Sequence, residues 1–314
     1  MNGFLVELGK RLADRWLSLL VLPGALFLGV LAAGRALGHG RWYAVGDLPT
    51  RLDRHTRTLA GSTADTVSLF VAFLLAAAAC GLAAQALGSL AERLWLADDW
   101  HGWPRGLHRP VRRLIARRAR IYAERSAEAA TAAANAGLEP PPRDAAHRAA
   151  VAATRMARVA DGPPVRPTWP GDRLQAVAER LRDGLGLRVA VVWPHLWLHA
   201  PDATRAEVTE AREAMRRAAT LAGWGVLYLF VAAFWWPGAV IACGVVLTAW
   251  YRFRAATDAY ATLVESAVRL HVQELARSLG IGRRGPLTPA HGAALDAYLA
   301  TGDEPPAELL LPPE

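Results

Sequence analysis

The stretch "FVAAFWWPGAVIACG", residues 230–244, lies inside the longest uncharged run of the chain, which extends from Ala218 to Tyr251. Arg217 precedes this run and Arg252 follows it. A single helix over the run would be about 51 Å long at 1.5 Å per residue, whereas the hydrocarbon core of a bilayer is about 30 Å thick. The run therefore predicts two helices of membrane type, and its centre decides how they are connected.

The centre of the run carries the residues of a turn at a membrane surface. Pro237 lacks a backbone donor and clashes with the preceding helical turn, and Gly238 gives the backbone freedom beside it. Tryptophan favours the membrane–water interface, so we predict a helical hairpin over 218–251. Its turn is predicted at Trp235, Trp236, Pro237 and Gly238. A re-entrant hairpin or one kinked helix remains the alternative.

Two earlier runs have the length of a membrane span. Residues 16–34 lie between Arg15 and Arg35, and residues 66–91 lie between Asp65 and Glu92, and neither run contains a charge. About twenty apolar residues cross the hydrocarbon core. The first run exceeds the apolar core of a signal peptide and lacks an obvious cleavage site, which favours an uncleaved anchor. The sequence thus predicts an all-α integral membrane protein with four transmembrane helices and a helical cytoplasmic region.

The second run is rich in small residues that recur at helical spacing. Such spacing lets helix backbones approach closely in lipid. Alternatively, the chain comes from a GC-rich genome, whose proteins are rich in alanine, and the same residues then have no packing role. Both interpretations stay open. The predicted packing residues are Ala77, Gly81, Ala84 and Gly88.

The distribution of charge orients the predicted spans. The chain has 314 residues, 20% of them charged, and a net charge of +8. Arginines are concentrated after the second run and at both feet of the hairpin, so the positive-inside bias places both termini and the middle in the cytoplasm. Four segments follow. They are 1–92 with outer loop 35–65, the basic and mainly helical region 93–217, the hairpin 218–251, and the helix with a proline-rich tail 252–314.

The basic region begins with an arginine-rich helix at a membrane exit. Arginine beside aromatic residues also suits nucleic acid, but nothing here matches a nucleic-acid fold, and the position beside a span favours anionic phospholipid headgroups. We therefore expect lipid and no nucleic acid as partner. The predicted membrane-surface residues are Arg105, Arg109, Arg112, Arg113, Arg117 and Arg118. Arg216, Arg217, Arg252 and Arg254 are expected to snorkel from the hairpin ends.

Further along, Asp172 is expected to cap the helix that follows the proline-rich loop 161–172, and the tail from 302 is expected to be disordered. "GIGRRG" at 280–285 has dinucleotide-loop spacing, but it follows a helix and precedes a proline, so a helix end is favoured. "DDWH" at 98–101 has no companion motif. No catalytic residue, metal ligand or cofactor is predicted.

Two stretches show a family resemblance. They are "RPTWPGDRLQAVAERL" and "LGLRVAVVWPHLWLHAP", and the helix from Tyr251 to Leu263 adds to them. Together they resemble uncharacterised bacterial multi-pass, four-span membrane proteins with an Arg-Pro-Thr, Gly and Trp-Pro-x-Leu-Trp segment. The matching residues are Arg166, Pro167, Thr168, Gly171, Trp193, Pro194, Leu196 and Trp197, and His195 stands where the family has arginine. The resemblance implies architecture and no activity.

These patterns predict a non-enzymatic multi-pass protein of the bacterial inner membrane. It is expected to act as a scaffold or partner-binding module that presents residues 93–217 to a cytoplasmic protein, with homo-oligomers as a further possibility. The alternative is a pore-forming effector or channel of a bacterial conflict system, built from the short hairpin and the small-residue span. No span carries an Asp, Glu, Lys, Arg or His residue, which counts against proton-coupled transport.

Overall fold

The computed structural model describes residues 21–40, 63–97, 100–138, 143–281 and 287–310. Within these ranges the regular elements are helical, and the one β pairing is an isolated antiparallel bridge between Ile281 and Leu310. The predicted all-α fold class is confirmed. Residues 1–20 and 41–62 lie outside the described ranges, and with them lie the start of the first predicted span and most of the predicted outer loop.

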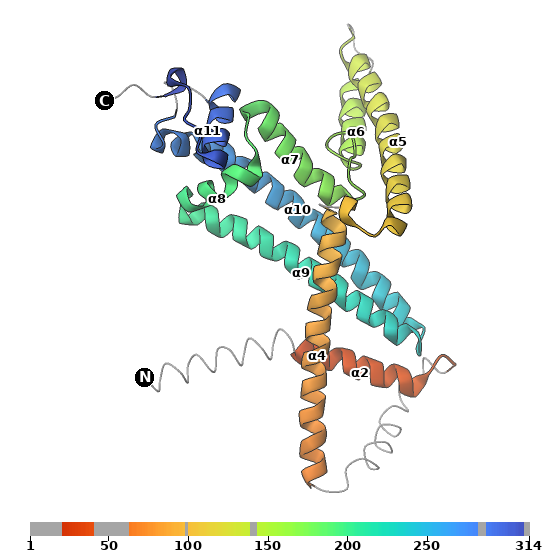
Figure 1. The fold of residues 1–314 in the computed structure, drawn as a ribbon. Coiled ribbons are helices and arrows are strands. Elements are labelled where there is room, and N and C mark those ends of the chain that lie inside the picture. The colour runs from red at the N-terminus through yellow and green to blue at the C-terminus, as the bar shows by residue number, and fades with distance from the viewer. Residues whose placement is uncertain (1–20, 41–62, 98–99, 139–142, 282–286, 311–314) are drawn as a thin grey trace, which may run out of the picture. The chain divides into compact units, whose positions relative to one another are not determined.

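The helices are shown in Figure 1. In chain order they are α2 (Leu22–Leu37), α4 (Thr63–Leu96), α5 (Arg105–Ala136), α6 (Ala145–Ala157), α7 (Trp169–Leu185), α8 (Val189–His199), α9 (Asp202–Ala232), α10 (Pro237–Ser278) and α11 (Pro289–Thr301), with short 3-10 turns η3 (Trp100–Gly102) and η4 (Ala307–Leu309). The chain divides into two compact units. Unit 1 comprises 1–92 and 216–253, and unit 2 comprises 93–215 and 254–314.

In unit 1 the small residues of α4 form a buried face. Ala77, Gly81, Ala84 and Gly88 are all buried. A Cβ atom added at Gly24 of α2 would overlap the Ala77 carbonyl, and one added at Gly223 of α9 would overlap the Ala84 carbonyl. Glycine is needed at both positions because backbone meets backbone there. The predicted small-residue face thus packs against helices of the same chain.

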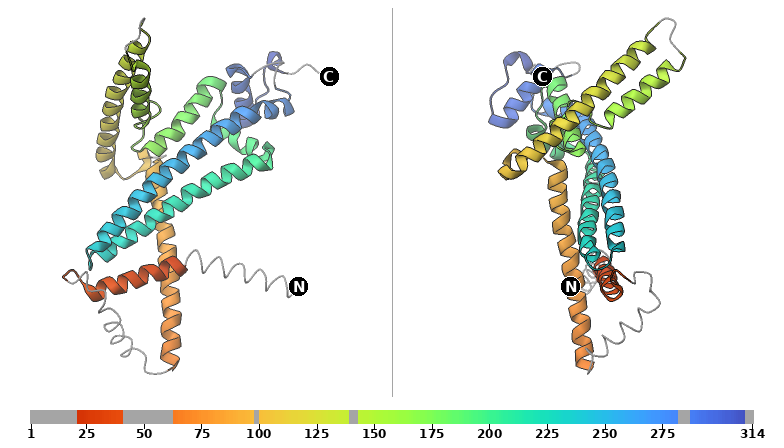
Figure 2. Two further views of the ribbon diagram at one scale, coloured as in Figure 1. Left: turned by 180° about the vertical axis from the view of Figure 1, so that it is seen from behind. Right: turned by 90° about the vertical axis from the view of Figure 1, so that its right-hand side faces the viewer.

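The turn between α9 and α10 occupies residues 233–236. α9 ends at Ala232 and α10 begins at Pro237, so the structure has two helices here, not one kinked helix. Trp235 and Trp236 lie in the turn, whereas Pro237 and Gly238 belong to the first turn of α10. Proline fits that position because the first helical residues have no intrahelical acceptor for their amides. α9 and α10 run side by side from this turn (Figure 2).

Unit 1 is apolar on its outside. Phe70, Leu75 and Phe230 are 62%, 67% and 63% exposed. α4 from Thr66 and α10 are long and apolar enough to cross a membrane, and only 17% of the most apolar window of each is buried. A core helix of a soluble protein would be mostly buried, so that explanation does not fit them.

The described residues thus contain two helices of spanning length, where the sequence predicted four spans. α2 is an apolar helix of 16 residues, which is about 24 Å long. The apolar part of α9, from Ala218 to Ala232, would be about 22 Å long. Both are shorter than the hydrocarbon core of about 30 Å.

Unit 2 has a conventional core formed by α7, α8, α11 and the second part of α10. Leu181, Leu187, Val192, Leu196 and Leu295 are fully buried in it. The apolar stretch after residue 187 is α8, and its buried residues belong to this core.

The prediction of a disordered tail is wrong for residues 302–310. Leu310 pairs with the buried Ile281, and η4 lies just before it. The physical reason is that the backbone of Ile281 gives the tail a pairing partner.

Candidate functional site

The most densely bonded polar site of unit 2 comprises the loop 158–168 and the first turn of α7, which follows it. Thr168 is the N-cap of α7, and its hydroxyl oxygen accepts a hydrogen bond from the Gly171 amide at 3.4 Å. The same hydroxyl donates to the Trp95 carbonyl at the end of α4. One threonine therefore caps the start of one helix and the end of another.

Arg166 and Gly171 complete the contact with the end of α4. The Arg166 guanidinium donates to the Leu96 carbonyl at 3.4 Å and to the Gln175 side chain at 2.9 Å. A Cβ atom at Gly171 would overlap the Leu96 carbonyl oxygen. The last carbonyls of a helix lack intrahelical partners and carry partial negative charge, so a cation and a hydroxyl stabilise them.

A buried ion pair holds this loop in place. The Asp172 carboxylate is 6% exposed, and one of its oxygens accepts from the Arg118 guanidinium. The other oxygen accepts from the amides of Val165 at 3.0 Å and Arg166 at 2.8 Å. Asp172 therefore does not cap α7 as the sequence predicted. It lies in the first helical turn and binds the loop, because Thr168 already occupies the cap position.

Arg118 departs from the predicted membrane-surface set. Its side chain is 14% exposed, and besides Asp172 it donates to the carbonyls of Arg166 at 2.6 Å and Val159 at 2.8 Å. A guanidinium with three partners inside the protein does not bind a headgroup. The prediction for Arg118 therefore does not agree with its position, and the cause is Asp172, which the helix pattern of α5 alone cannot show.

The other five arginines of the predicted set are exposed on α5. They are Arg105, Arg109, Arg112, Arg113 and Arg117. At about 100° per residue they fall within an arc of about 140°, and residue 118 lies about 100° outside that arc. Helical phase was thus the sequence signal that could have separated Arg118 from the stripe. We call these five residues the arginine stripe.

Arg254 is also bound within unit 2. Its guanidinium lies over the Trp169 ring at 4.2 Å from the centroid and donates to the Arg158 carbonyl. Burial, with repulsion from Arg118, lowers the pKa of Arg254, yet an arginine stays charged at neutral pH. The expectation that Arg254 snorkels into the membrane surface is therefore wrong, since an aromatic face and a carbonyl bind it.

Ion pairs join α7 to α10 along the same side. Arg173 contacts Asp258 at 2.6 Å and Asp161 at 2.9 Å. Arg180 contacts Glu265 at 2.7 Å. The hydrogen bond from Arg180 lowers the pKa of the Glu265 carboxyl, against the opposing effect of burial.

At the other end of α7, α11 packs against the turn that precedes α8. Asp296 is 6% exposed and accepts from the Arg188 amide at 2.9 Å and from its guanidinium at 2.6 Å. A Cβ atom at Gly292 would overlap the Leu185 carbonyl oxygen. α11 is thus a docked part of unit 2.

In unit 1, the end of α2 lies against the hairpin turn. The Arg35 guanidinium lies 5.0 Å from the centroid of the Phe234 ring. A Cβ atom at Gly34 would be 3.0 Å from the Trp235 Cβ. Trp235 has a buried indole nitrogen for which the described residues offer no hydrogen-bond partner.

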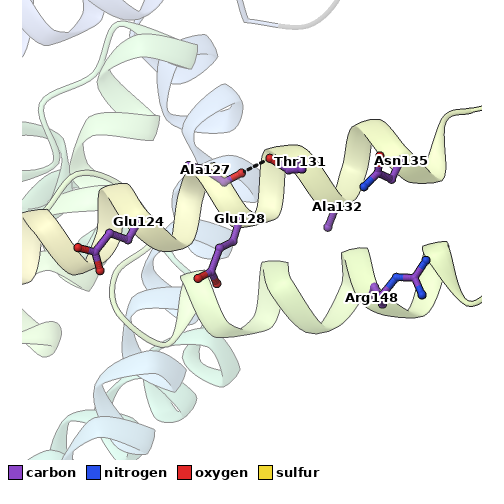
Figure 3. Close-up of a pocket in the computed structure, with 7 residues that line it drawn as sticks. All are labelled: Glu124, Ala127, Glu128, Thr131, Ala132, Asn135 and Arg148. Carbon is purple, nitrogen blue, oxygen red and sulfur yellow. Dashed lines mark hydrogen bonds between the residues drawn. The ribbon is translucent and has the colours of Figure 1, made fainter.

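A shallow polar groove lies on the α5–α6 helical hairpin, and Figure 3 shows the residues that line it. The groove has a volume of about 490 Å³, and it receives Glu124 and Glu128 from α5 and Arg148 from α6. The Thr131 hydroxyl donates to the Ala127 carbonyl at 2.9 Å. Glu128 pairs with Arg125 at 2.7 Å. These polar groups are exposed, so the groove is a surface feature with no enclosed chemistry.

A metal site is not visible in the described part of the chain. Its His, Cys, Asp and Glu side chains form no group of three that could hold a metal ion. "DDWH" and "GIGRRG" fall partly outside the described residues, at 98–99 and 282–286.

Comparison of the chain with protein-family models, curated proteins and solved structures finds no match. The family resemblance therefore stays a prediction. Its residues nevertheless have identifiable places: Arg166, Thr168 and Gly171 contact the end of α4, and Leu196 lies in the core of unit 2.

Proposed function

We propose that the chain is a four-span protein of the bacterial inner membrane whose helical region outside the bilayer serves as a scaffold for a protein partner. One observation carries the membrane part. Most of the exposed large apolar side chains lie in unit 1, whereas unit 2 buries an apolar core between α7, α8, α10 and α11. An exposed apolar surface of the extent seen in unit 1 is unfavourable in water and favourable in a bilayer. Surfaces of this kind are covered by lipid or by another protein.

Contacts within unit 1 agree with the proposed topology. The end of α2 lies beside the α9–α10 turn through Gly34 and Trp235, and both are predicted on the outer side. Gly88 of α4 lies against Thr220 of α9, and both are predicted near the cytoplasmic side. The apolar parts of the hairpin helices are shorter than the hydrocarbon core. Local thinning of the bilayer can accommodate this difference in length, and so can the exposed Arg252 at the end of the hairpin, whose side chain can reach the headgroups.

The arginine stripe is proposed to bind anionic headgroups on the cytoplasmic surface. Its five members are exposed and share one face of α5. Each basic residue near an anionic surface contributes about 1 kcal/mol. The stripe would thus fix α5 against the membrane without inserting it.

The partner-binding role is proposed for the α5–α6 hairpin. Val111 and Ala145 are the buried residues of these two helices, and most of their other residues are exposed. A long, exposed helical hairpin with its own groove offers a partner a continuous face. The pore alternative has weaker support, because the small-residue face of α4 is already buried against α2 and α9 and is not available to join chains.

Spin labels test the headgroup contact. A label at Ala116→Cys lies among the stripe arginines, and a label at Ala153→Cys of α6 is the matched exposed control. Both are made in full-length chain whose native cysteines are alanine, reconstituted in nanodiscs. We expect anionic lipid to reduce the access of a water-soluble relaxing agent to residue 116 and not to residue 153.

Replacing the five stripe arginines by glutamine should abolish that difference, and added salt should weaken it. Equal access in anionic and neutral lipid would contradict the headgroup proposal. The scaffold proposal has its own test: dye-loaded vesicles containing the protein should stay tight with or without a bound partner. Leakage that requires the protein would favour the pore.

A further inference from the structure

Unit 2 contains a second hollow, between α7, α8 and α10, that no function above uses. It is a half-open cavity of about 230 Å³. Its lining includes Leu174 and Val177 of α7, Val189 and Trp193 of α8, and Tyr260 and Val264 of α10. Val177, Val264 and Ala261 are buried and form its floor. The other lining residues are half-buried or, at Ala190 and Pro194, exposed, so the cavity has a packed floor and an accessible mouth.

The lining is apolar except for two hydrogen-bonding groups. The Trp193 indole nitrogen and the Tyr260 hydroxyl have no hydrogen-bond partner among the residues the structure describes. The Trp193 ring packs against Trp197, with centroids 5.7 Å apart. Partly buried tryptophan and tyrosine usually satisfy their polar atoms. Neither group is used within the described part of the protein, so both can donate to water or to a ligand.

Charge around the cavity is already neutralised. None of the residues that line it is charged. Arg173 and Arg180, the arginines of α7 beside it, pair with Asp258 and Glu265 of α10. A charged ligand group would lose its hydration here and gain no free counter-charge. The cavity therefore favours a neutral ligand.

We infer that this cavity binds the apolar chain of a neutral lipid that carries an ester or hydroxyl oxygen as its hydrogen-bond acceptor. The volume lies below the range of about 300–1,000 Å³ typical of drug-sized ligands, which favours one chain segment over a fused ring system. The apolar floor holds the chain, and Trp193 and Tyr260 donate to the oxygen. The inference does not depend on the scaffold role, since it rests only on residues of unit 2.

Photolabelling tests the site with a defined probe. Full-length protein in nanodiscs receives a long-chain monoacylglycerol with a diazirine in its chain, and labelled peptides are identified by mass spectrometry after irradiation. We expect adducts on the peptides that contain Trp193 and Tyr260. Unlabelled monoacylglycerol should compete, whereas the fatty acid of the same chain length, which is anionic, should compete much more weakly.

Three variants make the result specific. Ala190→Trp places an indole in the cavity wall and should reduce labelling to background, whereas Ala206→Trp, on the exposed face of α9, should leave it unchanged. Tyr260→Phe keeps the shape and removes one donor, so the affinity should fall by about threefold to tenfold. Tyr260→Phe also keeps the test valid if Ala190→Trp fails to fold.

Two sources of the lipid are distinguished by the route of addition. A short-chain monoacylglycerol is added from water, and a long-chain one is supplied in the bilayer. Both present the same headgroup to the cavity. The route that gives more labelling of the cavity identifies the source of the lipid. Adducts that are equal in the unmodified protein and in Ala190→Trp would overturn the inference. Competition by the fatty acid as strong as that by the monoacylglycerol would overturn it as well.

Discussion

Removing the Asp172 carboxylate should release the loop that holds the end of α4. In Asp172→Ala, the Arg118 guanidinium loses its anionic partner, and the amides of Val165 and Arg166 lose their acceptor. Asp172→Asn keeps an oxygen for the two amides and places an NH2 group, which cannot accept, against the Arg118 guanidinium. The pair of substitutions therefore separates the ion pair from the amide contacts.

The structure sets the size of the effect. Breaking a buried ion pair by removing one partner costs about 3–5 kcal/mol. Arg118 keeps the carbonyls of Val159 and Arg166 as acceptors, so we expect the lower end, about 3 kcal/mol, for Asp172→Ala. For Asp172→Asn we expect about 1.5–3 kcal/mol, the loss of one hydrogen bond to a charged group, because the two amides keep their acceptor.

Hydrogen exchange measures this locally, in full-length protein in nanodiscs. About 3 kcal/mol corresponds to an exchange rate about two orders of magnitude faster at the amides of Val165 and Arg166. Asp183→Ala removes an exposed carboxylate from the same helix and should leave these amides unchanged. Exchange as slow in Asp172→Ala as in the unmodified protein would refute the reasoning, since it would mean that Asp172 does not hold the loop.

Further predictions concern packing and pH. Gly223→Ala should destabilise unit 1 by about 1–3 kcal/mol, because the added Cβ overlaps a carbonyl of α4. Gly244→Ala is the control: its Cβ would have nothing within 4 Å, so it should be neutral or stabilising by up to about 1 kcal/mol. Thermal unfolding of both variants in the same lipid measures the difference. The pKa of Glu265 is lowered on folding, so its ion pair stabilises the protein above the unfolded value of about 4.3 and is lost as the pH falls through the lower folded value. Glu265→Gln should therefore flatten the acid side of a curve of unfolding free energy against pH. The change should be less than about 1 kcal/mol, because the Arg180–Glu265 pair is partly exposed. An unchanged curve would contradict the stabilising role of this ion pair. Gly292→Ala should detach α11, seen as faster limited proteolysis after residue 287; proteolysis at the unmodified rate would show that the overlap is relieved without undocking.

Helix class and helix breaks followed from the sequence because they depend on local chemistry. The uncharged run with Pro237 at its centre predicted two helices, and the structure places the break at 233–236. Small residues at spacings of three and four predicted a packing face, and Ala77, Gly81, Ala84 and Gly88 are buried together. In each case the pattern lies within one element, so no knowledge of distant residues was required.

The polar site of unit 2 could not be predicted in the same way because its partners are far apart in the chain. Arg118 and Asp172 are separated by 54 positions, and Arg180 and Glu265 by 85. An arginine on an amphipathic helix has the same local pattern whether it faces headgroups or a buried carboxylate. Helical phase distinguishes Arg118 from the stripe, but only the tertiary contact identifies its partner.

The end of α4 shows why a distant loop is needed there. α4 is followed by Ala97, which is fully buried and has φ of +44°, a conformation that usually requires glycine. A non-glycine residue held there costs about 1–3 kcal/mol and persists only where surrounding contacts enforce it. Thr168 and Arg166 supply those contacts by donating to the last two carbonyls of the helix. The sequence near residue 97 contains no local stop signal because the stop is made by residues some seventy positions later, which is also why the Arg-Pro-Thr segment and the exit of α4 must be considered as one structural element.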